Sequence, residues 1–142
     1  MSIATILSSK GGDVATVDVE VPLLDAVAQL AERRIGALVV TENGEVVGIV
    51  SERDLVRCIA RQGAAVLDRP VRDAMTAPAV TIDRTTPLLG ALSTMTQRRF
   101  RHLPVVENGQ LVGLVSIGDL VKFRIDSIEH EAEALRSYIQ SA

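Results

Sequence analysis

Residues 42–56 read ENGEVVGIVSERDLV and residues 107–121 read ENGQLVGLVSIGDLV, so one stretch occurs twice. Each copy opens with Asn-Gly, which tolerates positive φ at both central turn positions and favours a two-residue β-hairpin. An apolar strand follows, and its internal glycine allows another group to approach the backbone closely. Each copy ends in Ser-x-x-Asp, where a helix is expected to begin. The hairpin and the helix start therefore define a structural unit that the chain uses twice.

The repeat extends beyond this stretch. Residues 16–57 align with residues 81–122 at a constant offset of 65 and without a gap, and about half the aligned positions are identical. A gapless internal repeat indicates two copies of one structural unit. Apolar periodicity predicts the order β-α-β-β-α within each unit. We therefore predict an α+β fold in which the two repeats pack with pseudo-twofold symmetry.

The repeat also sets the predicted domain boundaries. The first repeat, with a short lead-in helix before it, is expected at residues 1–63. A linker and a second lead-in helix are expected at residues 64–78, and the second repeat at residues 79–127. Residues 128–142 are expected to form a C-terminal helical extension.

The helix that begins at Ile117 has nothing to interrupt it before about Gln140. Its apolar residues are spaced alternately by four and three, which is the spacing of a heptad seam. The seam comprises Val121, Ile125, Ile128, Ala132, Leu135 and Ile139. An exposed stripe of this size predicts a homodimer formed through the helix. The alternative is that the helix folds back on its own module.

Composition excludes several classes of protein. The net charge is −3 and aromatic residues make up 2% of the chain, which argues against a nucleic-acid-binding surface with stacking aromatics. The N-terminal residues lack the features of a signal peptide, and no apolar run is long enough to span a membrane. The single cysteine, Cys58, fits a reducing compartment. We expect a cytoplasmic protein with no nucleic-acid or membrane partner.

The two Ser-x-x-Asp segments allow two interpretations. In the first, Ser51–Asp54 and Ser116–Asp119 are capping boxes that only stabilise the start of a helix. In the second, the carboxylate accepts hydrogen bonds from two vicinal ribose hydroxyls while the helix N-terminus faces phosphate. Capping and binding are compatible, so the pattern favours a site for a polyhydroxylated, phosphorylated ligand, present twice.

With these segments, AVTI at residues 79–82 and RHLPVV at residues 101–106, nearly the whole chain resembles a tandem pair of cystathionine-β-synthase (CBS) domains, also called a Bateman module. The resemblance implies adenosine ligands, namely AMP, ADP, ATP, sometimes NAD or S-adenosylmethionine, bound in clefts between the repeats. It also implies that paired modules associate as flat dimers.

The resemblance assigns roles to particular residues. Asp54 and Asp119 would hold ribose hydroxyls, and Ser51 and Ser116 would lie at the ribose and phosphate side. The resemblance also implies that Thr16 and Thr81 would border the adenine.

The two copies differ where phosphate would bind. The second copy has Arg101 and His102 where the first has glycine and alanine, and these side chains are candidates for phosphate contact. Arg53 is a further candidate. Alternatively, Arg101 and His102 form a solvated strand edge, and Arg53 is only an exposed helix residue. Unequal pockets are expected.

The paired arginines at residues 33–34 and 98–99 lie at predicted helix C-termini, where cations favour the helix dipole. We interpret them as structural. The sequence contains no metal-ligand spacing, nucleophile–base pair or Gly-rich phosphate motif. We therefore expect no catalytic residue, no metal and no obligatory cofactor.

These observations predict a regulatory adenine-nucleotide sensor rather than an enzyme. The ligand would bind between the two repeats, and a change of conformation or assembly would be read by a downstream protein that the sequence does not identify. The alternatives are a dimeric scaffold without a ligand and an enzyme acting on the bound nucleotide.

Overall fold

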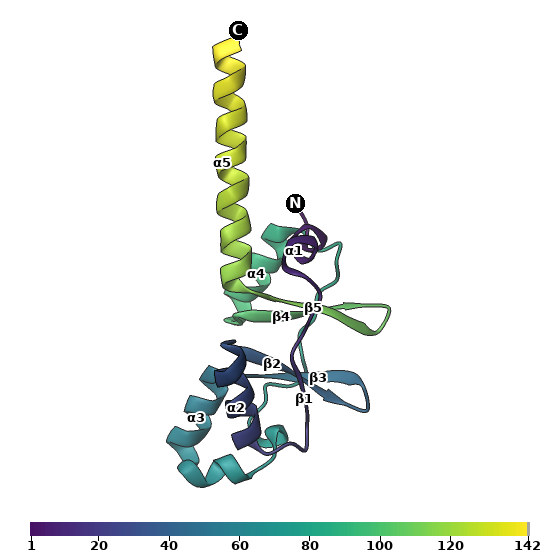
Figure 1. The fold of residues 1–142 in the computed structure, drawn as a ribbon, viewed down its shortest axis with the longest axis vertical. Coiled ribbons are helices and arrows are strands. Elements are labelled where there is room, and N and C mark those ends of the chain that lie inside the picture. The colour runs from purple at the N-terminus through teal and green to yellow at the C-terminus, as the bar shows by residue number, and fades with distance from the viewer. Residues whose placement is uncertain (142) are drawn as a thin grey trace.

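The computed structural model describes residues 1–141, which form two similar halves and a long C-terminal helix (Figure 1). The helices and strands, in chain order, are α1 (Ile3–Lys10), β1 (Thr16–Asp18), α2 (Leu23–Arg33), β2 (Ala37–Glu42), β3 (Glu45–Ser51), α3 (Glu52–Gln62), α4 (Leu88–Arg98), β4 (His102–Glu107), β5 (Gln110–Ser116) and α5 (Ile117–Ser141). Two 3-10 helices, η1 (Ala64–Asp68) and η2 (Val71–Asp73), connect the halves. The predicted α+β class with a duplicated unit is confirmed.

The hairpins form as the Asn-Gly pairs predicted. Strand β2 pairs antiparallel with β3, and β4 pairs antiparallel with β5. Asn43 and Gly44 have φ of 52° and 80°, and Asn108 and Gly109 have φ of 51° and 76°. Positive φ at both central residues is the requirement of this turn, and asparagine and glycine meet it at low cost.

The second sheet departs from the predicted order. In the first half, β1 lies parallel to β2, and the Val39 amide donates to the Ala15 carbonyl at 3.2 Å. The position of Val39 is taken in the second half by Pro104, which has no amide hydrogen to donate. The strand expected near residues 79–82 is therefore reduced to a single bridge between Ile82 and Val105.

Each half has its own hydrophobic core, and each core includes the segment that precedes the other repeat in the sequence. The first core is built from residues 17–74, so the stretch at residues 64–75 packs with the half that precedes it. The second core takes Ile3, Ile6 and Leu7 from α1, and the three side chains are at most 5% exposed. Helix α1 therefore packs with the half that is distant in sequence, as Figure 1 shows.

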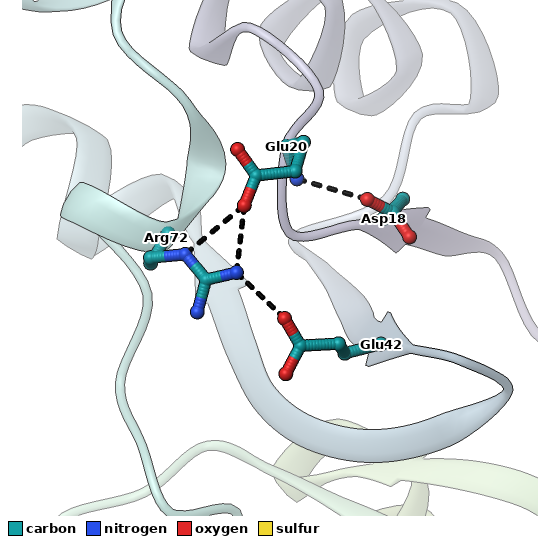
Figure 2. Close-up of polar contacts among 4 residues, drawn as sticks. All are labelled: Asp18, Glu20, Glu42 and Arg72. Carbon is teal, nitrogen blue, oxygen red and sulfur yellow. Dashed lines mark hydrogen bonds and ion pairs between the residues drawn. The ribbon is translucent and has the colours of Figure 1, made fainter.

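The residues predicted as a linker are structured. Helix η1 occupies residues 64–68, and its Val66 is 2% exposed within the first core. An ion-pair cluster then fixes the following segment (Figure 2). Arg72 donates to Glu20 Oε1 and to Glu42 Oε2, each at 2.6 Å from Nη2. These contacts hold the connecting segment against the edge of the first sheet.

The glycines inside β3 and β5 are positions of close approach. A side-chain carbon at Gly48 would lie 2.7 Å from the Thr76 carbonyl oxygen. One at Gly113 would lie 2.5 Å from the Leu7 side chain. Both distances are shorter than van der Waals contact, so an alanine at either position would force the facing group to shift. At Gly48 that group is a backbone oxygen, and at Gly113 it is a leucine side chain.

Helix α5 begins within the second core and then leaves the body of the molecule (Figure 1). Leu120 in its first turn is fully buried, whereas Ile128, Leu135 and Ile139 are 47–63% exposed. The alternative in which the helix folds back on its own module is not what the structure shows. None of the helices in residues 1–141 combines the length and apolar character needed to cross a membrane.

Candidate functional site

Two pockets are described below. The larger of the two, about 900 Å³ in volume, lies between the two halves. The first half lines it with the end of β3 and the start of α3. The second half lines it with the end of α4, the start of β4 and the start of α5. The segment at residues 76–80, which crosses between the halves, completes the wall. A ligand here would contact both repeats and their connection.

Asp54 lies on the first turn of α3 at one side of this pocket. Its Oδ2 accepts from the Ser51 amide at 2.8 Å and from the Ser51 hydroxyl at 3.0 Å. The Asp54 amide in turn donates to the Ser51 hydroxyl at 3.3 Å, which completes the predicted capping box. Oδ1 accepts from the Thr76 hydroxyl at 3.0 Å. Within residues 1–141, the described hydrogen bonds to this carboxylate come only from neutral donors.

Five arginines line the same pocket. They come from α3, from the C-terminal end of α4 and from the residues before β4, and they are Arg53, Arg57, Arg98, Arg99 and Arg101. The ion pairs described within residues 1–141 use other basic residues, so these guanidinium groups are not neutralised by a carboxylate. Glu52 and Asp54 are the acidic residues of the lining. The pocket therefore offers a cationic wall to an anion.

Apolar side chains line the remainder of the pocket. Ile49, Val80, Met95, Phe100 and Ile117 provide flat or flexible apolar surface of the kind that contacts a heterocyclic base.

A smaller pocket of about 570 Å³ lies at the equivalent place of the other repeat. It is lined by Arg33, Arg34 and Ser116, and by Lys10 from the end of α1. The carboxylate that corresponds to Asp54 is Asp119, and its Oδ2 is 2.6 Å from Lys10 Nζ. The two pockets are unequal, as predicted. The smaller one has this lysine, and it has Gly36 and Gly118 at the positions that Arg101 and Arg53 occupy at the larger one.

The environment of Asp119 favours its charged form. Partial burial raises the pKa of the carboxyl, but the hydrogen bonds from Lys10 and from the Ser116 amide outweigh burial, so the net pKa lies below its usual value. The Ser116 amide donates to Asp119 Oδ2 at 2.8 Å, and the Asp119 amide donates to the Ser116 hydroxyl at 3.1 Å. Both Ser-x-x-Asp segments are therefore capping boxes.

His102 lies between the pockets and lines both of them. It is half-buried against Gly36, where an added side-chain carbon would be 3.3 Å from the ring. Burial lowers the pKa of His102, and the nearby Lys10 charge lowers it further, while Asp119 and Glu52 partly oppose these effects. The neutral ring is thus favoured at the point where the two pockets meet.

The structure brings together most of the residues predicted from sequence. Ser51, Arg53, Asp54, Arg101 and His102 line the larger pocket, and His102 and Ser116 line the smaller one. Asp119 is not among the described lining residues of the smaller pocket, but it pairs with Lys10, which is. Thr16 and Thr81 are exposed and are not among the described lining residues, whereas the residues just before them are.

Sequence reasoning did not identify Lys10, Arg57, Thr76 and the paired arginines of residues 33–34 and 98–99 as pocket residues. The arginine pairs did carry a signal, because they recur at the same offset as the Ser-x-x-Asp segments. Arg34 and Arg99 end their helices in the left-handed region, with φ of 56° and 57°. Such a position is more often glycine, so an arginine there in both repeats makes the pair a candidate for function.

Two copies of the β-hairpin unit with a pocket between them define the class of protein. The CBS domain matches residues 5–61 and 71–126, so the chain belongs to the CBS-domain family and carries two such domains.

Individual relatives agree with this assignment. The mitochondrial CBS domain-containing protein CBSX3 of Arabidopsis thaliana is 34% identical over 148 residues, covering 98% of this chain and 72% of the relative. A CBS-domain protein from Agrobacterium tumefaciens is 45% identical with a TM-score of 0.85, covering 87% of this chain and 99% of that structure. A CBS domain protein from Pyrobaculum aerophilum, solved with AMP, is 28% identical with a TM-score of 0.74, covering 84% of this chain and 89% of that structure.

Proposed function

We propose that this protein is a regulatory module that binds an adenosine phosphate in the larger pocket. The observation that carries the proposal is the composition of that pocket, to which α3 of the first half contributes the Asp54 carboxylate and two arginines and the second half contributes three more arginines. A carboxylate accepts from the two hydroxyls of a ribose, and guanidinium groups bind phosphate oxygens as bidentate donors. AMP, ADP and ATP match this arrangement, and NAD shares the adenosine and phosphate groups.

Two further observations support the proposal. The AMP complex of the Pyrobaculum aerophilum relative shows that a CBS-domain protein of the same fold takes such a ligand. The pocket also offers Val80, Met95 and Phe100 for the base, and about 900 Å³ is within the usual range of small-molecule sites. CBS-pair proteins are generally regulatory rather than catalytic, and this supports a regulatory role.

The proposed signal is a shift between conformations of the module. A ligand in the larger pocket would contact α3 of one half, the segment before β4 of the other and the crossing segment at residues 76–80. It would therefore stabilise one relative arrangement of the halves by its greater affinity for that arrangement. A downstream protein would read the arrangement.

We also propose a cytoplasmic location. The free thiol of Cys58 fits a reducing compartment such as the cytoplasm.

Thermal unfolding tests the ligand class. A ligand at about 100 times its Kd adds roughly 2.7 kcal/mol to the free energy of unfolding, so AMP, ADP or ATP should raise the melting temperature. GMP and pyrimidine nucleotides should raise it less. Native mass spectrometry of protein purified without added nucleotide would then identify a retained ligand. Equal shifts from AMP and GMP would contradict an adenosine site, and no shift from any nucleotide would favour a scaffold.

We also propose a homodimer assembled through α5. Leu135 and Ile139 are 60% and 63% exposed on a helix that projects from the body. Leu24 and Leu89 add exposed apolar surface at equivalent positions of α2 and α4. A second copy offers the same surface, and a twofold interface is self-complementary.

Charge placed in the stripe tests this assembly. The double substitution Leu135→Asp with Ile139→Asp should produce a monomer in sedimentation velocity. Ser137→Asp with Ser141→Asp adds the same charge on the opposite side of the helix and should leave the dimer intact. A dimer that survives the first pair, and also survives removal of residues 128–142, would show that α5 is not the interface.

A further inference from the structure

Lys10 makes a specific connection at the smaller pocket. Its ammonium group donates to Asp119 Oδ2 at 2.6 Å and to the Leu114 carbonyl oxygen at 2.8 Å. These bonds join the last residue of α1 to strand β5 and to the first turn of α5. The Lys10 and Asp119 side chains are 38% and 26% exposed, so the pair is partly shielded from water.

Lys10 has no counterpart in the other repeat. Leu7 lies over Gly113 as Met75 lies over Gly48, so these two crossing segments correspond at an offset of 68 rather than 65. The first segment is therefore three residues longer than the second before the repeat resumes, and Lys10 lies in this longer part. The length difference extends α1 far enough for its last residue to reach the carboxylate.

The consequence is a chemical difference between the two carboxylates. At the larger pocket, Thr76 is a neutral donor to Asp54, and its hydroxyl can rotate away when a diol arrives. At the smaller pocket, Asp119 Oδ2 already accepts from the Lys10 ammonium and from the Ser116 amide, so a diol that used both carboxylate oxygens would have to displace an ammonium group. Hydrogen bonds between charged groups are roughly twice as strong as neutral ones, so this exchange is the less favourable of the two.

We propose that Lys10 closes the smaller pocket to nucleotides, so that each chain binds one nucleotide, in the larger pocket. The inference rests on the proposed function, because it concerns the same class of ligand. It assigns Lys10 as the residue that sets the number of sites. The N-terminal helix thus supplies a cation to Asp119, whereas in the other repeat the crossing segment supplies Asp54 with the neutral hydroxyl of Thr76.

Titration calorimetry with AMP tests the inference on the full chain. Wild type should bind one AMP per chain, and Lys10→Met, which keeps the length of the side chain and removes its charge, should bind two. In Asp54→Ala the remaining binding should be weak, and adding Lys10→Met should strengthen it at least tenfold. Lys122→Met is the control, because this exposed lysine of α5 lines neither pocket, and it should behave as wild type.

The outcomes separate the two proposals. Two equivalents bound by wild type, or one equivalent bound by wild type and by Lys10→Met alike, would overturn the role of Lys10 and leave the nucleotide-binding function intact. One equivalent bound by Lys10→Met and none by wild type would support the role of Lys10 and overturn the assignment to the larger pocket. Absence of binding to every variant would overturn both.

Discussion

Replacement of Asp54 by alanine separates ligand binding from helix capping. The carboxylate accepts three hydrogen bonds, from the Ser51 amide, the Ser51 hydroxyl and the Thr76 hydroxyl, at 2.8–3.0 Å. Loss of the capping box should lower the free energy of unfolding by about 1 kcal/mol, measured by urea denaturation. Loss of the acceptor for a ribose diol should cost a further 1.5–3 kcal/mol of binding, which is about a ten- to hundredfold rise in Kd for AMP.

Asp119→Ala is the matched control for this change. It removes an equivalent capping box, with bonds of 2.8 Å and 3.1 Å to Ser116, together with the ion pair to Lys10. Its stability loss should be at least that of Asp54→Ala, whereas the Kd of the larger pocket should change by less than about twofold. An Asp54→Ala protein that loses stability yet binds AMP with unchanged affinity would refute the ribose-binding role.

Three further predictions concern stability. Gly48→Ala should destabilise the protein by about 1–3 kcal/mol in urea denaturation, since the new methyl group meets a backbone oxygen, and more than Gly113→Ala, where it meets a flexible side chain. The lowered pKa of His102 should make the wild type lose stability relative to His102→Gln as the pH falls from about 6.5, the pKa of the unfolded residue, through the lower folded pKa. Ile6→Ala should cost about 2–5 kcal/mol, and hydrogen exchange should place the loss in α4, β4 and β5.

Each of these predictions has a contradicting result. Equal costs at the two glycines would show that the carbonyl contact at Gly48 is relieved without strain. Parallel pH profiles for wild type and His102→Gln would show that the ring is solvated in the folded protein. Faster exchange in β1–β3 after Ile6→Ala would show that α1 stabilises the first core, which would contradict its packing in the second.

The parts of the fold that sequence predicted are those set by local chemistry. The Asn-Gly turns, the strand glycines and the Ser-x-x-Asp caps each depend on a few adjacent residues, and a gapless offset showed that the unit was repeated. The pairing of α1 with the second core was not predictable in this way, because it depends on which of two similar apolar faces the helix covers. The missing strand of the second half did have a local cause, which was Pro104.

The residues of the candidate site were likewise predictable only where their signal is local in the sequence. Asp54 and Ser51 were predicted because the motif is local and repeated. Lys10 was missed because it lies in the one segment where the two repeats differ in length, and its partner Asp119 is distant in sequence. The position of the paired arginines at the pockets was not predicted, because a cation at a helix C-terminus already has a structural explanation.

The composition of the two cores also fixes an order of events during synthesis. The first core needs only residues 17–74, so it has all its parts once the chain is made to about residue 75. The second core needs residues from Ile3 to Leu120, so α1 must wait without its partner while more than a hundred further residues are made. Helix α1 is made before either core and is therefore among the last segments to dock. When it docks, it brings Lys10 to the smaller pocket, so that the same event finishes the fold and sets the difference between the two sites.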